Sequence, residues 1–103
     1  MADPVTVAQT SEIAEGQCKQ VVVGTKPILI CHAQGAFYAI DDTCTHDDGP
    51  LADGLLEGFE IECPRHGARF DVRTGKVICL PAAMAITSYP VTVEGEAIKV
   101  SVE

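Results

Sequence analysis

Apolar and polar residues alternate over short stretches of this chain and show no helical spacing. Alternation with a period of two is typical of half-buried strands, and Gly, Pro and Asp residues separate the apolar stretches. We therefore predict an all-β fold, a sandwich or small barrel without repeats or a linker. The predicted strands are Val5–Ala8, Cys18–Val23, Lys26–Cys31, Ala36–Ile40, Glu60–Glu62, Arg69–Val72, Tyr89–Val93 and Ala97–Val102.

The dipeptide Gly24-Thr25 predicts how two of these strands pair. Two-residue turns with Gly at a positive-φ position are the commonest hairpin connection. Counting outward from this turn places Cys18 opposite Cys31, at a non-hydrogen-bonded position where side chains approach closely. We interpret these two residues as neighbouring thiols and not as metal ligands, and Cys79 likewise as structural, because free cysteine is commonly buried.

Length and charge narrow the class of protein. With 103 residues, 47% of them hydrophobic, the chain predicts a single globular domain, residues 1–103. The net charge of −8 repels phosphate and anionic lipid, so neither nucleic acid nor membrane is an expected partner. The acidity fits a basic protein partner, and it fits equally a role in solubility alone.

No targeting segment or membrane span is visible in the sequence. The longest apolar run, Val77–Ile86, is too short to cross a bilayer and contains Pro81. We therefore expect a cytoplasmic protein. In a reducing compartment, clustered cysteines are more often metal ligands than disulfides.

Cys44, His46, Cys63 and His66 form the strongest chemical signal. They occur as Cys-x-His and, sixteen residues later, as Cys-x-x-His. Two thiols and two imidazoles fit a structural zinc ion, and they fit a [2Fe–2S] cluster in which one iron carries two histidines. Zinc fingers usually pair like with like, whereas each loop here contributes one cysteine and one histidine. The alternation favours a cluster with two irons, because each loop can then send one ligand to each iron.

The segments "CTH", "CPRH" and "HGARFDVRTGKV" resemble the Rieske ferredoxins, and the similarity extends over essentially the whole chain. It is greatest to the ferredoxin components of bacterial aromatic-ring dioxygenase systems. The resemblance implies that Cys44 and Cys63 bind the inner iron and that His46 and His66 bind the outer iron. It also implies a Rieske-type β-sandwich with a small cluster-binding subdomain, roughly residues 43–72.

The resemblance implies a monomeric one-electron carrier that is not itself an enzyme. A flavin-containing NAD(P)H reductase would reduce the cluster, and a terminal oxygenase would accept the electron. The sequence has three histidines, so only His32 remains beyond the cluster, and a catalytic iron with two histidines cannot be built. We interpret His32 as a structural hairpin residue after the strand Lys26–Cys31. The Rieske-type small subunit of an assimilatory nitrite reductase and a zinc-stabilised interaction module remain as alternatives.

Four positions differ from those of high-potential respiratory Rieske proteins. Gly49 and Arg65 stand where those proteins carry a disulfide, and Ala68 and Phe70 stand where they carry hydroxyl groups that donate to sulfur. Such hydrogen bonds stabilise the more negative, reduced cluster. Their absence predicts a potential at the low end of the Rieske range, on the order of −150 mV. The segment around Leu80–Pro81 resembles the third loop that covers the cluster.

Charged residues near the two ligand loops have simpler interpretations. We interpret Asp41, Asp42, Asp47 and Asp48 as turn residues, since their spacing lacks the pattern of a calcium-binding loop. Arg69 and Arg73 are expected in ordinary surface ion pairs.

Overall fold

The computed structural model describes residues 4–42, 54–63, 68–79 and 85–101. Across these residues the strands form three antiparallel sheets, and the one helix is the short 3-10 helix η1, Thr10–Glu12. The first sheet has the order β1 (Val5–Gln9), β11 (Ala97–Val100), β10 (Val91–Glu94). The second has the order β2 (Cys18–Val23), β3 (Lys26–Ala33), β4 (Ala36–Asp41), β9 (Ser88–Tyr89). The third has the order β5 (Leu55–Glu57), β6 (Glu60–Glu62), β7 (Arg69–Asp71), β8 (Val77–Cys79).

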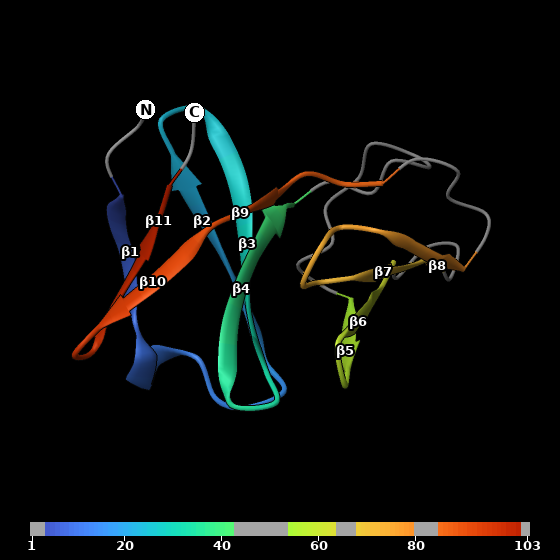
Figure 1. Ribbon diagram of the computed structural model, residues 1–103, viewed down its shortest axis with the longest axis horizontal. Coiled ribbons are helices and arrows are strands. Elements are labelled where there is room, and N and C mark those ends of the chain that lie inside the picture. Colours follow the sequence, from blue (N-terminus) through green and yellow to red (C-terminus); the bar gives the residue numbers. More distant parts are fainter. Residues whose placement is uncertain (1–3, 43–53, 64–67, 80–84, 102–103) are drawn as a thin grey trace.

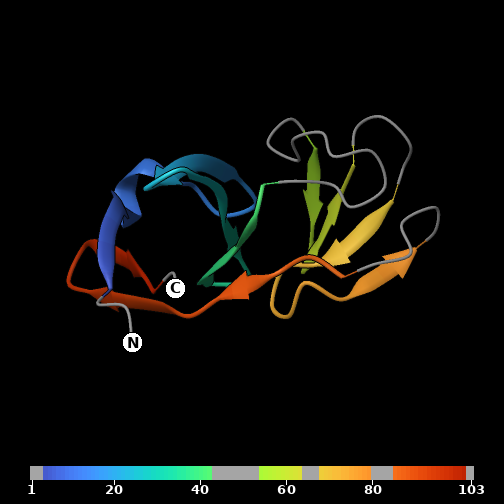
Figure 2. The same ribbon diagram turned by 90° about the horizontal axis from the view of Figure 1, so that it is seen from above.

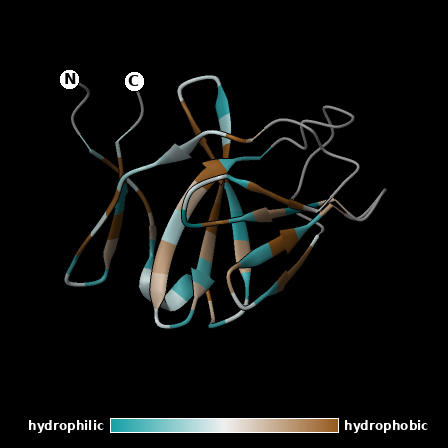
Figure 3. Ribbon diagram, turned by 45° about the vertical axis from the view of Figure 1, so that its right-hand side comes forward, coloured by the Kyte–Doolittle hydropathy of each residue, from teal (hydrophilic) through white to brown (hydrophobic). Residues whose placement is uncertain are grey.

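The second sheet is the central layer, with the first sheet on one side and the third on the other (Figures 1 and 2). Its strand β3 is apolar on both faces. Ile28 and Ile30 pack against the first sheet, whereas Leu29 and Cys31 pack toward the third. Strands buried on both faces read as near-continuous apolar runs, which explains the sequence "ILIC" in this strand. Other strands show the banding of apolar and polar residues expected when one face is solvated (Figure 3).

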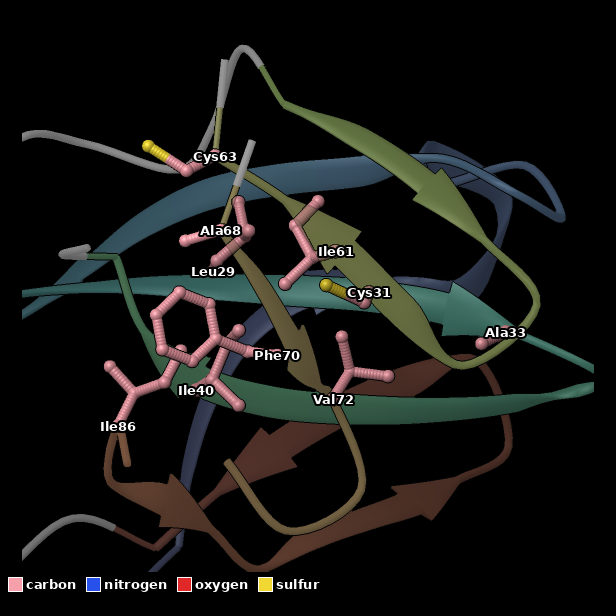
Figure 4. Close-up of a cluster of buried hydrophobic side chains, with 10 residues drawn as sticks. All are labelled: Leu29, Cys31, Ala33, Ile40, Ile61, Cys63, Ala68, Phe70, Val72 and Ile86. Carbon is pink, nitrogen blue, oxygen red and sulfur yellow. The ribbon is translucent and has the colours of Figure 1, made fainter. Parts of the chain in front are cut away.

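Two buried clusters hold the layers together. The cluster between the first and second sheets consists of Ala8, Ile13, Ile28, Ile30, Ala39, Ile98 and Val100. The cluster between the second and third sheets, drawn in Figure 4, consists of Leu29, Cys31, Ala33, Ile40, Ile61, Cys63, Ala68, Phe70, Val72 and Ile86. The third sheet is therefore attached to the sandwich through its own hydrophobic core.

The predicted all-β fold and its first hairpin are confirmed. Strands β2 and β6 have the predicted bounds, and Gly24 has the predicted positive φ, 64°. The register places Val23 opposite Lys26 and Cys18 opposite Cys31. The turn chemistry of Gly24-Thr25 was thus enough to specify the pairing of twelve strand residues, from 18 to 23 and from 26 to 31.

The single strand predicted over Tyr89–Val93 is wrong, because the chain changes sheet at Pro90. Tyr89 pairs with Ala39 in the central sheet, and Val91 pairs with Val100 in the first sheet. Proline has no N–H to donate to a sheet ladder, so Pro90 stands at the break between β9 and β10. This crossing connects the central sheet to the first sheet.

Two strands of the third sheet were not predicted. β5 and β8 have three residues each, and their side chains Leu55 and Ile78 are exposed. A three-residue strand is too short to show a periodic pattern, and β8 begins within the apolar run Val77–Ile86. The last strand was predicted to end at Val102, which lies outside the described residues. Within them, β11 ends at Val100.

Candidate metal centre

Of the four predicted ligands, Cys63 lies within the described residues. It follows β6 directly and is buried, with a relative exposure of 1%. Figure 4 shows it at the edge of the second cluster, with its sulfur directed away from Ile61. Cys44, His46 and His66 lie outside the described residues, as do Gly49, Arg65 and the segment Leu80–Pro81. The structure describes the residues and strands on either side of these segments.

A main-chain hydrogen bond closes the base of the second ligand segment. The Cys63 N–H donates to the Ala68 carbonyl at 2.7 Å, which continues the β6–β7 pairing in which Glu62 lies opposite Arg69. Cys63 and Ala68 are both buried in the second cluster. The residues on both sides of the segment that contains His66 are therefore attached to the third sheet, and Cys63 is the residue directly before that segment.

Asp42 anchors the chain just before the segment that carries Cys44 and His46. Its side chain is buried, with a relative exposure of 2%, and accepts a hydrogen bond from the Gln20 side-chain amide. Its N–H donates to the Pro27 carbonyl at 3.1 Å. Asp42 lies in the bend after β4, as expected of a turn residue, and its buried carboxylate also holds β4 to β2, because a buried carboxylate requires polar partners.

Asp41 makes a second attachment at the same place. It is the last residue of β4, and its N–H donates to the Thr87 carbonyl at 2.9 Å. The Tyr89 hydroxyl donates to its Oδ1 at 2.5 Å. Burial, together with this hydrogen bond, raises the pKa of Tyr89, so the hydroxyl keeps its proton and remains a donor at neutral pH. The interpretation of Asp41 as a turn residue is wrong, because the residue belongs to β4.

Ion pairs cover the outer face of the third sheet, as predicted for Arg69 and Arg73. The Arg69 guanidinium lies within 3.5 Å of Glu57 and Glu60 and 3.1 Å from Glu62. Arg73 donates to Asp71 at 2.8 Å and holds the pKa of that carboxyl below its ordinary value. Arg69 thus links β5, β6 and β7 beside the second ligand segment.

The contacts of His32 support its structural interpretation. It belongs to β3, which extends to Ala33, and does not follow the strand as predicted. Its ring stacks on Phe37 with centroids 4.1 Å apart, and Nδ1 lies 2.9 Å from the Ile13 carbonyl oxygen. Within the part of the chain that the structure describes, no three His, Cys, Asp or Glu side chains converge to hold a metal ion.

Cys63 fits an iron–sulfur ligand. A thiolate is a soft donor suited to such clusters, and burial beside Ala68 and Phe70 keeps its surroundings apolar. The other three donors, Cys44, His46 and His66, are of the types that a Rieske centre requires, and their roles stay a prediction.

Comparisons with known proteins agree with this framework. The family model described as the Rieske [2Fe-2S] domain matches residues 3–90. The chain is 44% identical over 89 residues to the naphthalene 1,2-dioxygenase system ferredoxin component of Pseudomonas aeruginosa, covering 86% of both chains. It matches the ferredoxin of carbazole 1,9a-dioxygenase from Nocardioides aromaticivorans IC177 with a TM-score of 0.93, at 33% identity, covering 97% of this chain and 98% of that one.

A third similar structure is a complex of reduced oxygenase and oxidised ferredoxin in carbazole 1,9a-dioxygenase. Its matching chain gives a TM-score of 0.89 at 33% identity and covers 95% of this chain and 92% of that one. Fold and sequence together define an iron–sulfur protein: this chain belongs to the Rieske [2Fe-2S] domain family. The cofactor of that family is a [2Fe–2S] cluster.

Proposed function

We propose that this protein is the ferredoxin component of a multicomponent aromatic-ring dioxygenase system, a one-electron carrier and not a catalyst. The observation that carries this proposal is the match over nearly the full length of both chains to a ferredoxin of a carbazole dioxygenase. The match that covers 86% of a naphthalene dioxygenase ferredoxin component supports the same role.

In this proposal Cys44, His46, Cys63 and His66 bind one [2Fe–2S] cluster, within a cluster-binding subdomain of roughly residues 43–72. The cluster supplies a site that accepts and releases one electron. The chain's own contribution is positional. The Cys63–Ala68 hydrogen bond and the buried Asp42 hold the residues that flank the two ligand segments to strands that pack in one core.

The proposed partners are a flavin-containing reductase, which delivers the electron, and a terminal oxygenase, which accepts it. A net charge of −8 supports docking on basic surfaces. A carrier that meets two partners in turn requires weak complexes. We also propose that the protein works as a monomer in the cytoplasm. Within the described residues no helix is long and apolar enough to span a bilayer.

Spectroscopy and reconstitution test this function. The purified protein is expected to be reddish-brown, to give a rhombic EPR signal on reduction, and to titrate at the low end of the Rieske range. Added to a flavin-containing reductase, NADH and an aromatic-ring oxygenase, it should make product formation depend on its concentration.

Matched variants locate the cluster. Cys63→Ser should abolish the EPR signal and electron flow, whereas Cys18→Ser, a similar change on β2 of the central sheet, should leave both unchanged. A colourless protein containing zinc would refute the cluster. A red protein that supports nitrite reduction but no aromatic-ring oxygenation would refute the assigned pathway.

A further inference from the structure

A pair of thiols lies across the first hairpin, outside the candidate metal centre. The Cys18 and Cys31 thiols are hydrogen-bonded to each other, with the two sulfur atoms 3.0 Å apart. The His32 N–H donates to the Gln17 carbonyl at 3.0 Å, which makes the Cys18–Cys31 pair the non-hydrogen-bonded one in the ladder. At such positions the Cα atoms are about 4.5 Å apart, at the short end of the range of about 4.4–6.8 Å that a disulfide spans.

Closing a disulfide here requires little movement. The sulfur–sulfur distance in a disulfide is about 2.05 Å, so the two atoms have roughly 1 Å to travel from their observed 3.0 Å separation. The register on both sides of the pair is regular, from Cys18 opposite Cys31 to Val23 opposite Lys26. Rotation of the side chains can therefore make the bond without a shift of the strands.

The two thiols differ in access to solvent. Cys18 is partly exposed, whereas Cys31 is fully buried, with a relative exposure of 0%. The hydrogen bond with Cys18 and burial raise the pKa of the Cys31 thiol, so Cys31 keeps its proton. A small oxidant from solvent thus reaches Cys18 first, and Cys31 is placed to react with the product.

The pair lies in the same buried cluster as the predicted ligand Cys63. Cys31 belongs to the same buried cluster as Cys63, and Cys18 packs against that cluster from β2. Figure 4 draws Cys31 in this cluster together with Ile61 and Cys63. The dithiol and the predicted ligand Cys63 are therefore parts of one core.

We infer that Cys18 and Cys31 form a second redox site, a dithiol that a hydroperoxide oxidises to a cross-strand disulfide. The Cys18 sulfur, as its thiolate, attacks one peroxide oxygen and the O–O bond breaks, which leaves a sulfenic acid on Cys18 and releases hydroxide. The Cys31 sulfur then attacks the Cys18 sulfur, the S–S bond forms, and the sulfenic oxygen leaves as water with the Cys31 proton. Two thiols lose two electrons, and one hydrogen peroxide becomes two waters.

This site is independent of the electron-carrier role and is tested on the protein with its cluster in place. Hydrogen peroxide is added in equimolar amount, remaining thiols are alkylated, and the protein is analysed by intact mass and peptide mapping. The expected product has lost the mass of two hydrogens and contains a peptide in which Cys18 is linked to Cys31. Dithiothreitol should restore both thiols, and the visible spectrum of the cluster should persist throughout.

Two variants separate the roles of the sulfurs. In Cys31→Ala, Cys18 should stop at a sulfenic acid that dimedone traps; in Cys18→Ser, Cys31 should stay unmodified for at least ten times longer. The inference is wrong if the wild-type thiols survive peroxide that oxidises glutathione in the same tube, or if Cys18 proceeds to sulfinic acid with Cys31 unlinked. It is also wrong if the Cys18–Cys31 link forms only in molecules that have lost their cluster colour.

Discussion

The main chains of Gly75 and Ile86 meet so closely that no side chain fits between them. The Ile86 N–H donates to the Gly75 carbonyl at 2.8 Å, and a Cβ added to Gly75 would lie 1.8 Å from the Ile86 carbonyl oxygen. Gly75 also has a φ of 80°, in the left-handed region. This contact holds the turn after β7 against the residue that leads into β9, on either side of the segment that contains Leu80 and Pro81.

Gly75→Ala is therefore expected to be strongly destabilising. An L-residue in the left-handed region costs about 1–2 kcal/mol, and here the backbone of Ile86 must also move. Gly95→Ala is the matched control, because Gly95 has a φ of 60° and nothing within 4 Å of an added Cβ. We expect the control to lower the melting temperature by roughly 4–8 °C for each kcal/mol, and Gly75→Ala to lower it at least twice as much. Equal losses in the two variants would show that the Ile86 contact can relax without cost.

The part of the fold that local rules determine could be predicted from sequence. Alternation identified the long strands, and Gly24-Thr25 specified a register that places Cys18 beside Cys31. The ligand signal is equally local in the sequence, and the ligand roles stay a prediction, with Cys63 found directly after β6. In each of these cases the feature is recognised from residues that are close together in the sequence.

The remaining features depend on residues far apart in the chain. Nothing near Asp42 in the sequence shows that Gln20 will cover it, and nothing near Gly75 shows that Ile86 will press against it. Pro90 can stand at a strand edge or at a break, and only the partners of β9 and β10 decide which. Long-range contacts of this kind have no sequence period, so pattern alone does not reveal them.

Glu15 predicts a specific dependence of stability on pH. The Gly35 N–H donates to one of its carboxylate oxygens at 2.7 Å and the Gln34 N–H to the other at 2.8 Å, within the β3–β4 turn. These bonds, first that from Gly35, lower the pKa of Glu15 from its ordinary value, with a further contribution from the charge of His32. The stabilisation is therefore present above the unfolded-state pKa of about 4.3 and is lost as the pH falls through the lower pKa of the folded state.

Glu15→Gln should remove this dependence. Its melting temperature is expected below that of the wild type at pH 7, and the gap should close as the pH falls below about 4.3. Glu96→Gln, an exposed carboxylate in the turn between β10 and β11, removes the same charge and should leave the wild-type profile unchanged. The assignment to Glu15 is wrong if both variants give one profile.

Arg69 predicts a dependence of stability on salt. It neutralises Glu57, Glu60 and Glu62, which would otherwise repel one another across β5 and β6. Arg69→Met should lower the melting temperature in dilute buffer, and the loss should shrink as sodium chloride screens the carboxylates. Arg69→Lys keeps the charge without the planar guanidinium group, so its melting temperature should lie between those of the wild type and Arg69→Met. A loss from Arg69→Met that is the same at all salt concentrations would indicate lost packing as its cause.

Ala68 predicts how the potential of the proposed cluster can be raised. Its side chain is buried in the same cluster as Cys63, and its carbonyl accepts the Cys63 N–H, so Ala68→Ser adds a hydroxyl close to a proposed ligand residue. One added hydrogen bond is worth about 0.5–1.5 kcal/mol. If it favours the reduced form, the midpoint rises by roughly 20–65 mV, since about 59 mV corresponds to about 1.4 kcal/mol for one electron. Ala68→Gly changes the packing without adding a donor and should leave the midpoint lower than that of Ala68→Ser. A redox titration monitored by EPR that gives the same midpoint for both variants would show that the hydroxyl does not reach the ligand sulfur.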